Sequence, residues 1–155
     1  MNQNRIKLPI SHELFKLELG CGNTIKDGYI GLDKGDYGQD IIWDMTKGIP
    51  LPDNSCSVIH CHSVLEHIGP SKDFITVMNE CLRVLNNGGI MNVCVPDYST
   101  FTAFKDPTHV RFFTKATFTY LEKVNTWRYG FDKRWIIESN EKKGDSWYVV
   151  LIANK

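Results

Sequence analysis

Two glycines one residue apart, Gly20 and Gly22, directly follow a short stretch, 15–19, in which apolar and charged residues alternate. That alternation predicts a strand. Glycine accepts positive φ and has no Cβ, so the turn can double back tightly and let a ligand approach the backbone. A second apolar stretch, residues 29–33, ends in Asp33. Ligands of open parallel sheets bind beyond the carboxyl ends of the strands, where an acid takes the ribose hydroxyls, so the pattern predicts a nucleoside site.

The residues around the glycines distinguish between nucleoside ligands. A dinucleotide fingerprint would have Gly or Ala at the position of Ile25 and its acid about 20 residues further on. Here Asp33 follows Gly20 by only thirteen residues. Glu18, just before the turn, would repel a pyrophosphate but attract an ammonium group. The charges therefore favour S-adenosylmethionine, which carries an amino group and a sulfonium but no phosphate, over NAD.

These residues resemble the first motif, acid-x-Gly-x-Gly, of the S-adenosylmethionine-dependent methyltransferases of the Rossmann-like class, and in particular the small "type 11" family. Further stretches are similar to that family in the same order, over about residues 15–124: 41–45, 51–55, 58–67, 83–89, 93–97 and 109–114. The resemblance implies an α/β fold in a single methyltransferase domain, residues 1–155. Its Rossmann-like sheet would be mostly parallel and end in a C-terminal antiparallel hairpin.

For the methionine end of the cofactor, the resemblance implies contacts with the glycine turn. Glu18 is expected near the ammonium group, directly or through water. The residues expected to wrap this end are Gly20, Cys21, Gly22 and Asn23. The alternative is an ordinary strand-to-loop turn without a ligand.

For the adenosine end, Asp33 is expected to accept hydrogen bonds from both ribose hydroxyls, because a carboxylate can accept two side by side. Asp44 is expected to accept from the adenine amino group, with the Met45 N–H reaching the ring, and His62 to lie beside the cofactor. Two alternatives stay open: Asp33 as a solvated turn acid, and Asp44 as a capping aspartate before Thr46.

The acceptor side is expected at residues 106–111, which lie between the fifth strand and the last helix and should open over the cofactor mouth. His109 could take a proton from a hydroxyl acceptor, because an unperturbed imidazole titrates near working pH. The alternative is a loop histidine that bonds to backbone. Asp97 is a rival base. Arg111 would either grip an acidic acceptor or pair with Asp106.

A metal site is a further alternative, since His60, Cys61, His62 and His67 lie close together in the sequence. Strand alternation places His60 and His62 on one side and Cys61 on the other. Tetrahedral zinc usually draws paired ligands from two segments, and the sequence offers no second cluster. We therefore predict no metal, and interpret His67 as a hydrogen-bonded structural histidine.

Length and composition restrict the function classes. The 155 residues suffice for one domain with a real core. Eighteen basic and eighteen acidic residues give zero formal charge, which argues against nucleic acid and membrane surfaces and favours small-molecule chemistry. Five cysteines without a Cys-x-x-Cys pair indicate a reducing compartment. The sequence shows no signal-peptide core or membrane-length apolar run, so we expect a cytoplasmic protein.

Helices are predicted unevenly along the chain. Residues 20–29, 35–38 and 46–55 leave no room for helices between strands one to four. Downstream, Ser71 should cap a helix that Gly88 and Gly89 stop, followed by a buried strand over 90–95. Thr114 should cap a second helix. Its expected inward residues are Phe118, Leu121 and Val124.

The C-terminus and the sheet surface complete the expected architecture. Strands are predicted over 135–137 and 147–153, with 141–145 as the hairpin loop. Missing helices would leave sheet around strands one to three uncovered. A homodimer, or a lid from residues 1–14, which could cover a sheet edge or the cofactor, would remove the cost of exposing it.

Together these features predict an enzyme that transfers a methyl group from S-adenosylmethionine to a small molecule or glycan precursor, at oxygen or nitrogen. One alternative is a methyltransferase-fold module that binds the cofactor, or is catalytically silent, without transfer. A nicotinamide oxidoreductase is disfavoured by Ile25 and by the early position of Asp33.

Overall fold

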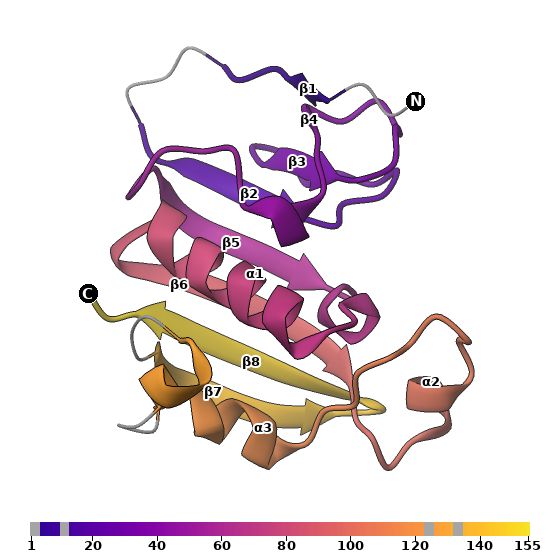
Figure 1. Ribbon diagram of the computed structural model, residues 1–155. Helices are drawn as coiled ribbons and strands as arrows, with labels where there is room; N and C mark the ends of the chain where they lie inside the picture. Colours follow the sequence, from indigo (N-terminus) through magenta and orange to yellow (C-terminus); the bar gives the residue numbers. More distant parts are fainter. Residues whose placement is uncertain (1–3, 10–12, 123–125, 132–134) are drawn as a thin grey trace.

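A computed structural model describes residues 4–9, 13–122, 126–131 and 135–155, and its strands form one eight-stranded sheet (Figure 1). The strand order is β1-β4-β3-β2-β5-β6-β8-β7. The strands are β1 (Arg5–Ile6), β2 (Phe15–Leu19), β3 (Ile30–Asp33), β4 (Ile41–Ile42), β5 (Cys56–His62), β6 (Leu85–Pro96), β7 (Trp135–Lys143) and β8 (Ser146–Ala153). The α-helices are α1 (Ser71–Val84), α2 (Phe101–Phe104) and α3 (Lys115–Thr119), and the 3-10 helices are η1 (Met45–Lys47), η2 (Leu65–His67), η3 (Tyr120–Glu122) and η4 (Thr126–Tyr129).

The sheet has the predicted topology. Strands β4, β3, β2, β5 and β6 run parallel, whereas β8 pairs antiparallel with β6 and with β7, so the mostly parallel sheet with a C-terminal hairpin is confirmed. The chain leaves β2 toward β3 on one side and returns to β5 on the other. This reversal is the topological switch point at which open sheets bind ligands.

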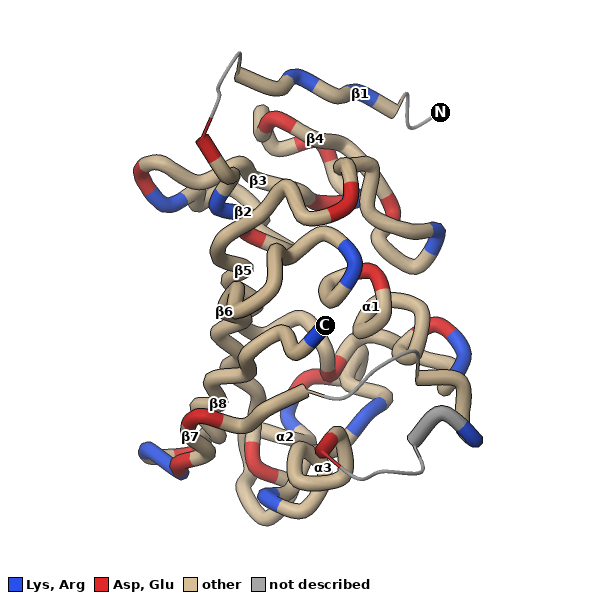
Figure 2. The backbone as a smooth tube through the Cα atoms, turned by 90° about the vertical axis from the view of Figure 1, so that its left-hand side faces the viewer, with Lys and Arg blue, Asp and Glu red and all other residues tan. Residues whose placement is uncertain are grey.

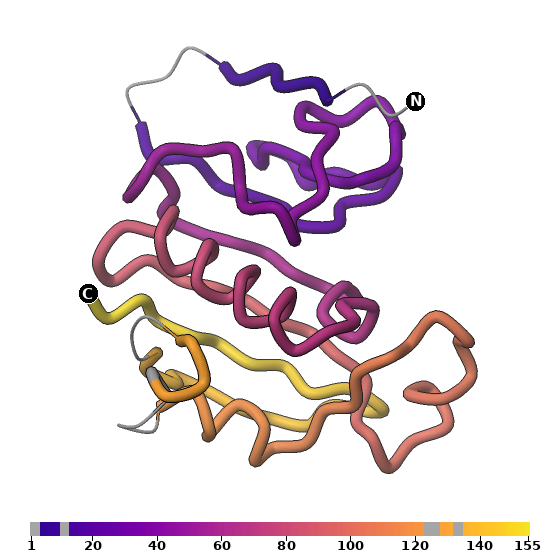
Figure 3. Tube along the Cα trace, viewed as in Figure 1, coloured from indigo at the N-terminus to yellow at the C-terminus, as the bar shows by residue number. Residues whose placement is uncertain are grey.

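The N-terminal segment lies along the sheet edge. Strand β1 pairs antiparallel with β4, with Arg5 opposite Ile42, and the N-terminal trace runs along the outer edge of the molecule in Figure 3. Arg5 also donates to the backbone carbonyl of Gln39 at 2.9 Å and to the Asp36 carboxylate at 3.2 Å. Of the two roles left open for residues 1–14, the described part therefore covers a sheet edge.

Several element boundaries differ from the prediction. Pro70 rather than Ser71 is the N-cap of α1, and its carbonyl accepts from the N–H of Phe74 at 3.2 Å. The helix ends at Val84, because the next residue already has extended backbone and opens β6. The two glycines expected to stop the helix instead lie within β6, opposite a register shift in β5.

Other boundaries follow the prediction more closely. Thr114 caps α3 as expected, accepting from the N–H of Thr117 at 3.3 Å. Phe118 and Leu121 are buried, whereas Val124 lies outside the described residues. The hairpin turn is shorter than expected, because β7 continues to Lys143.

The three connections without room for a helix are confirmed as helix-poor. Among the described residues between β2 and β5, the one helical element is the three-residue η1. Gln39, 1% exposed, organises the connection from β3 to β4. Its amide nitrogen donates to the carbonyls of Asp33, Gly35 and Ile41 at 3.2, 2.6 and 3.3 Å. Its amide oxygen accepts from the N–H of Tyr37 at 2.8 Å. A single side chain thus satisfies backbone groups that a helix would satisfy internally.

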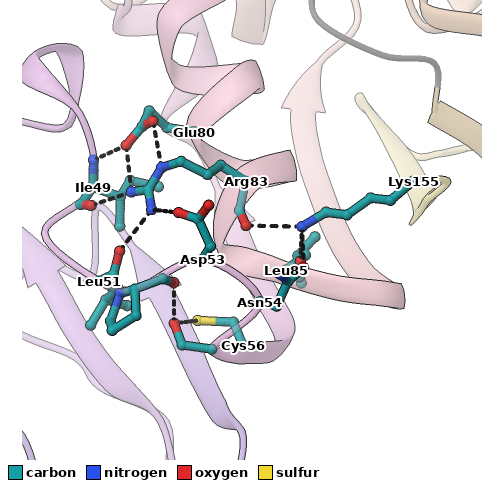
Figure 4. A network of polar contacts seen from close by, with 11 residues as sticks. Ile49, Leu51, Asp53, Asn54, Cys56, Glu80, Arg83, Leu85 and Lys155 are labelled. Carbon is teal, nitrogen blue, oxygen red and sulfur yellow. Dashed lines mark hydrogen bonds and ion pairs between the residues drawn. The ribbon is translucent and has the colours of Figure 1, made fainter.

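Arg83, near the end of α1, does the same for the connection from β4 to β5 (Figure 4). Its guanidinium donates to the carbonyls of Ile49 and Leu51 at 2.7 and 2.9 Å, and to the carboxylate of Asp53 at 2.6 Å. Glu80 holds the guanidinium with contacts of 2.7 and 2.8 Å and also accepts from the N–H of Ile49 at 2.7 Å. The hydrogen bonds from Arg83 lower the pKa of Glu80. The helix thereby anchors the loop that precedes β5.

Helices α1 and α3 lie on one face of the sheet, and α2 lies beyond the carboxyl end of β6 (Figure 1). In Figure 2 the strands line one side of the molecule and α1 the other. The core between them is apolar, and α1 contributes Phe74, Val77, Met78, Cys81, Leu82 and Val84. No helix of the described residues is long and apolar enough to span a membrane.

Part of the opposite face of the sheet is apolar. Exposed apolar side chains lie on β6, β7 and β8, at Ile90, Ile136 and Tyr148, and also beside β2, at Leu14 and Ile25. Near β3, the loop after the glycine turn covers part of the sheet. The Ile25 side chain lies against Gly31, where an added Cβ would be 3.0 Å from it. Dimerisation through this face stays a prediction, which a molecular mass from light scattering would test.

Removing the Arg83 guanidinium should loosen the loop before β5. For Arg83→Met we expect the free energy of unfolding to fall by about 2–3 kcal/mol, since two loop carbonyls and a carboxylate lose a charged donor. Urea denaturation measures this. Lys72→Met, at an exposed position of the same helix, is the matched control and should change stability little. Equal stability of both variants would contradict the anchoring role.

Candidate functional site

The glycine turn after β2 is shaped by its positive φ angles, +64° at Gly20 and +54° at Gly22. The Gly20 N–H donates to the Leu32 carbonyl at 2.8 Å, which ties the turn to β3. A Cβ on Gly20 would lie 2.4 Å from a methyl group of Val64, so only glycine fits there. At Gly22 nothing lies within 4 Å of where a Cβ would be. The turn is thus packed on one side and leaves open space on the other, which suits a ligand close to the backbone.

Asp33, the last residue of β3, connects both sides of this turn. Its Oδ2 accepts from the Gly22 N–H at 3.0 Å and its Oδ1 from the Gly35 N–H at 2.9 Å. Because each carboxylate oxygen has two lone pairs, both oxygens can still accept a hydroxyl. The residue is therefore placed both to hold the turn and to bind a diol.

A cavity of about 430 Å³ opens beyond the carboxyl ends of β3 and β4. Asp44 lines it and caps η1, since its Oδ1 accepts from the N–H and hydroxyl of Thr46 at 3.0 and 2.7 Å. Oδ1 of Asp44 therefore has the capping role that was the alternative, and Oδ2 remains for a further hydrogen bond. The other lining residues are Asn4, Lys34, Gly35, Tyr37, Ile42, Trp43 and Lys47. The cavity has a volume typical of small-molecule sites, with aromatic walls and charges of both signs.

The remaining predicted residues of the turn have less room for a ligand. Cys21 is buried, and burial, together with the charge of Asp33, raises the pKa of its thiol to about 11. Asn23 is exposed and accepts from the Thr24 hydroxyl at 3.3 Å. Met45 is partly buried and packs against the core. All three lie on the loops that border Asp33 and Asp44.

Glu18 and His62 lie on the helix-free face. The buried carboxylate of Glu18 accepts from the Lys26 N–H at 2.9 Å and lies 3.0 Å from Nδ1 of His60. His62 stacks on His60 with ring centroids 3.8 Å apart and lines a second cavity, of about 270 Å³, with Tyr148. Burial and the nearby His60 charge lower the pKa of His62 to about 4. The structure therefore groups these residues apart from the Asp44 cavity, and their cofactor roles stay predictions.

Asp97, one of the two predicted bases, is 4% exposed and fully engaged. Burial opposes its ionisation, but hydrogen bonds from Lys142, Ser99 and Trp147 outweigh this and lower its pKa to about 2. Ser99 donates at 2.7 Å and the Trp147 indole at 3.0 Å. A carboxylate with so low a pKa is a weak proton acceptor. Its role as a base stays a prediction, and these contacts favour a structural role.

His109, the other predicted base, has an ordered ring. Its Nδ1 lies 2.9 Å from the Ala103 carbonyl, which can only accept, so Nδ1 carries the proton and Nε2 keeps a lone pair in the neutral ring. The nearby Asp106 carboxylate lies 4.0 Å from Nε2. His109 thus makes the backbone bond of the alternative interpretation, but leaves its second nitrogen for chemistry.

Arg111 does not pair with Asp106, which corrects that interpretation from the sequence. Its guanidinium donates to the carbonyls of Ile68 and Gly69 at 3.3 and 2.8 Å and stacks over the Phe74 ring at 4.4 Å. Its contact with an acidic acceptor stays a prediction. The side chain instead fastens the 106–111 segment to the turn after η2.

Glu66 is the buried acid that sequence reasoning passed over. Only 1% exposed, it lies next to His67 in η2, and burial raises its pKa. The signal in the sequence is a carboxylate directly after Val64 and Leu65, in a segment otherwise apolar enough for the core. An acid at such a position needs a partner or a function.

The Asp97 ion pair predicts a particular acid sensitivity. Its folded pKa of about 2 lies below the unfolded value of about 3.9, so it stabilises the fold above about pH 4, and this contribution is lost as the pH falls through 2. For Lys142→Met we expect a lower free energy of unfolding at neutral pH and a smaller loss between pH 4 and 2. Urea titrations across that range measure both.

The matched control for this prediction is Lys143→Met, which removes a neighbouring cation that pairs with the exposed Glu141 at 3.3 Å. It should leave the loss of the free energy of unfolding between pH 4 and 2 unchanged. If Lys142→Met lost as much stability between pH 4 and 2 as the unsubstituted chain, Lys142 would not lower the Asp97 pKa.

Comparison with known proteins identifies the relatives of this sheet and site. Residues 31–93 match a family model described as Methyltransferase domain. A probable S-adenosylmethionine-dependent methyltransferase of Mycolicibacterium smegmatis is 36% identical over 77 residues, which are 47% of this chain and 29% of that protein. The chain thus spans less than a third of the length of this curated relative.

Solved structures share the fold at low sequence identity. A methyltransferase structure from Methanosarcina mazei has a TM-score of 0.64 and 15% identity, and the alignment covers 92% of both chains. A Burkholderia thailandensis 1,6-didemethyltoxoflavin-N1-methyltransferase, solved with S-adenosylhomocysteine, has a TM-score of 0.65 and 10% identity over 92% of this chain and 72% of that one. By fold over most of its length, and by sequence over residues 31–93, the chain is similar to S-adenosylmethionine-dependent methyltransferases.

Proposed function

We propose that this chain binds S-adenosylmethionine and transfers its methyl group to a small molecule or glycan precursor, at oxygen or nitrogen. The observation that carries the proposal is the bond from the Gly22 N–H to Asp33, 3.0 Å long, at the topological switch point of the sheet. It places a carboxylate with free lone pairs beside an open glycine turn, which fits the diol of a ribose.

The chain's own residues would bind and orient the cofactor. Asp33 accepts the ribose hydroxyls, and the Asp44 cavity, with Trp43 and Tyr37 on its walls, takes the adenine ring. Open space at Gly22 leaves room for the methionine end. Glu18 acts through the backbone, since it holds the far end of the glycine loop at the Lys26 N–H. When bound, S-adenosylmethionine supplies an electrophilic methyl group on a sulfonium.

The acceptor would bind between η2 and the 106–111 segment, beyond the carboxyl ends of β5 and β6 (Figure 3). Exposed aromatic rings gather nearby: Phe104 stacks on Phe112 with centroids 4.7 Å apart, and Tyr98 and Phe101 are also exposed. Such rings suit a planar or sugar acceptor rather than a highly charged one. On this side His109 offers the free lone pair of Nε2.

A module that binds the cofactor without transferring its methyl group is the second candidate. The observation that favours it is the state of Asp97, one of the two predicted bases, whose engaged carboxylate is a weak proton acceptor. Methyl transfer to some acceptors needs mainly positioning, which keeps the enzyme as the first candidate. Binding of S-adenosylhomocysteine with no methyl transfer to any acceptor tested would support the module.

The ribose assignment is tested by Asp33→Ala. We expect binding of S-adenosylhomocysteine to weaken by about 1–3 kcal/mol, because charged hydrogen bonds to the hydroxyls are lost. Isothermal titration calorimetry measures the affinity, and circular dichroism checks that the variant is folded. Asp27→Ala removes an exposed acid from the same loop and should bind as the unsubstituted chain does. Equal affinities for the two variants would overturn the assignment, and binding of NAD instead of S-adenosylhomocysteine would overturn the function.

A further inference from the structure

Two segments distant in the sequence meet at the mouth of the sheet. The backbone carbonyl of Glu66 accepts from the N–H groups of Val110 and Arg111 at 2.9 and 3.1 Å. The guanidinium of Arg111 adds its bonds to the carbonyls of Ile68 and Gly69. These contacts hold η2 and the 106–111 segment together, and bring His67 against His109 with ring centroids 4.7 Å apart.

The Glu66 side chain lies at this junction, beside His67 and His109. Its residue is 1% exposed, and among the described residues neither carboxylate oxygen has a hydrogen-bond partner. A buried carboxylate without hydrogen bonds costs several kcal/mol, so it requires a proton or a cation. Within the described part of the chain, one group of three potential metal ligands occurs, and it contains Glu66, His67 and His109, with one ligand atom from each within 4.8 Å of the others.

Both rings are held in the tautomer that a metal needs. The Thr108 hydroxyl donates to the Asp106 carboxylate at 2.7 Å, so its oxygen accepts from Nδ1 of His67, 2.9 Å away. Nδ1 of His109 donates to the Ala103 carbonyl. Both neutral rings therefore keep their lone pair on Nε2. Histidines that bind metals commonly donate their other N–H to a carbonyl or a hydroxyl–carboxylate pair in this way.

We propose that Glu66, His67 and His109 bind a divalent first-row transition-metal ion, with Zn²⁺ as the reference case. Two imidazoles and one carboxylate favour such ions over Mg²⁺ or Ca²⁺, which prefer oxygen ligands. Ligand atoms around tetrahedral zinc lie about 3.3 Å apart, given metal–ligand distances near 2.0–2.1 Å. The 4.8 Å spacing thus has to close by about 1.5 Å. The exposed His67 ring can supply that movement by rotation.

The prediction of no metal rested on the sequence offering no second ligand cluster. In the structure the second segment is a single residue, His109, which the sequence alone does not place beside Glu66 and His67. His60 and His62 do not belong to this group. His60 already contacts Glu18 and the Lys26 ammonium group at 3.0 and 2.7 Å, and lies on the helix-free face.

This inference deepens the proposed function and, for the acceptor, rests on it. Three protein ligands leave at least one coordination position open, as in catalytic zinc sites. At the acceptor side that position suits an oxygen atom, whose hydroxyl pKa a bound cation lowers. The acceptor class is then a hydroxyl compound rather than an amine. Nε2 of His109, once bound to the ion, no longer takes the proton, which passes to solvent.

Metal binding itself is tested without any methyl acceptor. The full chain, dialysed against EDTA and then against buffer, is titrated with Co²⁺, and binding is followed by visible d–d absorption and by displacement with Zn²⁺. We expect one Co²⁺ per chain. Glu66→Gln keeps the side-chain shape, removes a buried charge and should fold, and together with His109→Gln it should abolish the absorption. Thr108→Val, which breaks the hydrogen bond to His67, should weaken binding about 10–100-fold.

His62→Gln is the matched control, because it removes a histidine from the helix-free face and should leave Co²⁺ binding unchanged. Three outcomes would overturn the proposal: no Co²⁺ bound by the unsubstituted chain, equal binding by Glu66→Gln, or displacement of Co²⁺ by equimolar Mg²⁺. Calorimetry with S-adenosylhomocysteine on Glu66→Gln separates the two proposals. Unchanged cofactor affinity with lost Co²⁺ binding supports the metal site, whereas a chain that binds Co²⁺ but no S-adenosylhomocysteine refutes the proposed function alone.

Discussion

The central constraint on this fold is that three connections lack α-helices, so their backbone N–H and C=O groups need hydrogen-bond partners from elsewhere. A helix satisfies its own N–H and C=O groups, whereas a loop packed against a sheet needs partners from elsewhere. Here individual side chains supply them: Glu18 and Asp33 for the glycine loop, Gln39 for the next connection and Arg83 for the third. These contacts replace helices in holding the loops that connect β2, β3, β4 and β5.

The same economy of structure links stability to binding. Asp33 holds the glycine turn and also presents its lone pairs toward the space where a ribose would lie. Asp44 caps η1 and lines the neighbouring cavity. Residues with both duties are placed accurately, since the contacts that position them exist before a ligand binds. The other consequence is a sheet with helices on one face, which leaves Ile136 and Tyr148 partly in solvent.

Two buried acids at the acceptor end have opposite surroundings. Asp97 receives hydrogen bonds from an ammonium, a hydroxyl and an indole, and its pKa falls to about 2. Glu66 has no such donors among the described residues, and burial raises its pKa. Environments that drive two similar groups apart in this way often assign them different roles. The satisfied acid holds β7 to the end of β6, and the unsatisfied one retains the capacity to bind a cation.

The local order of residues determined much of this protein. Alternation before Gly20, the acid at Asp33 and the short connections could be interpreted directly, because periodicity and turn chemistry act over a few residues. The pairing of Asp97 with Lys142 and the isolation of Glu66 beside His109 were decided only by the tertiary structure. The partners lie more than forty residues apart in each case, and only the packing of the sheet ends determines which side chains meet. Helix α1 likewise ends before Gly88 and Gly89, because Leu85 already pairs with Cys56 of β5 and belongs to a strand.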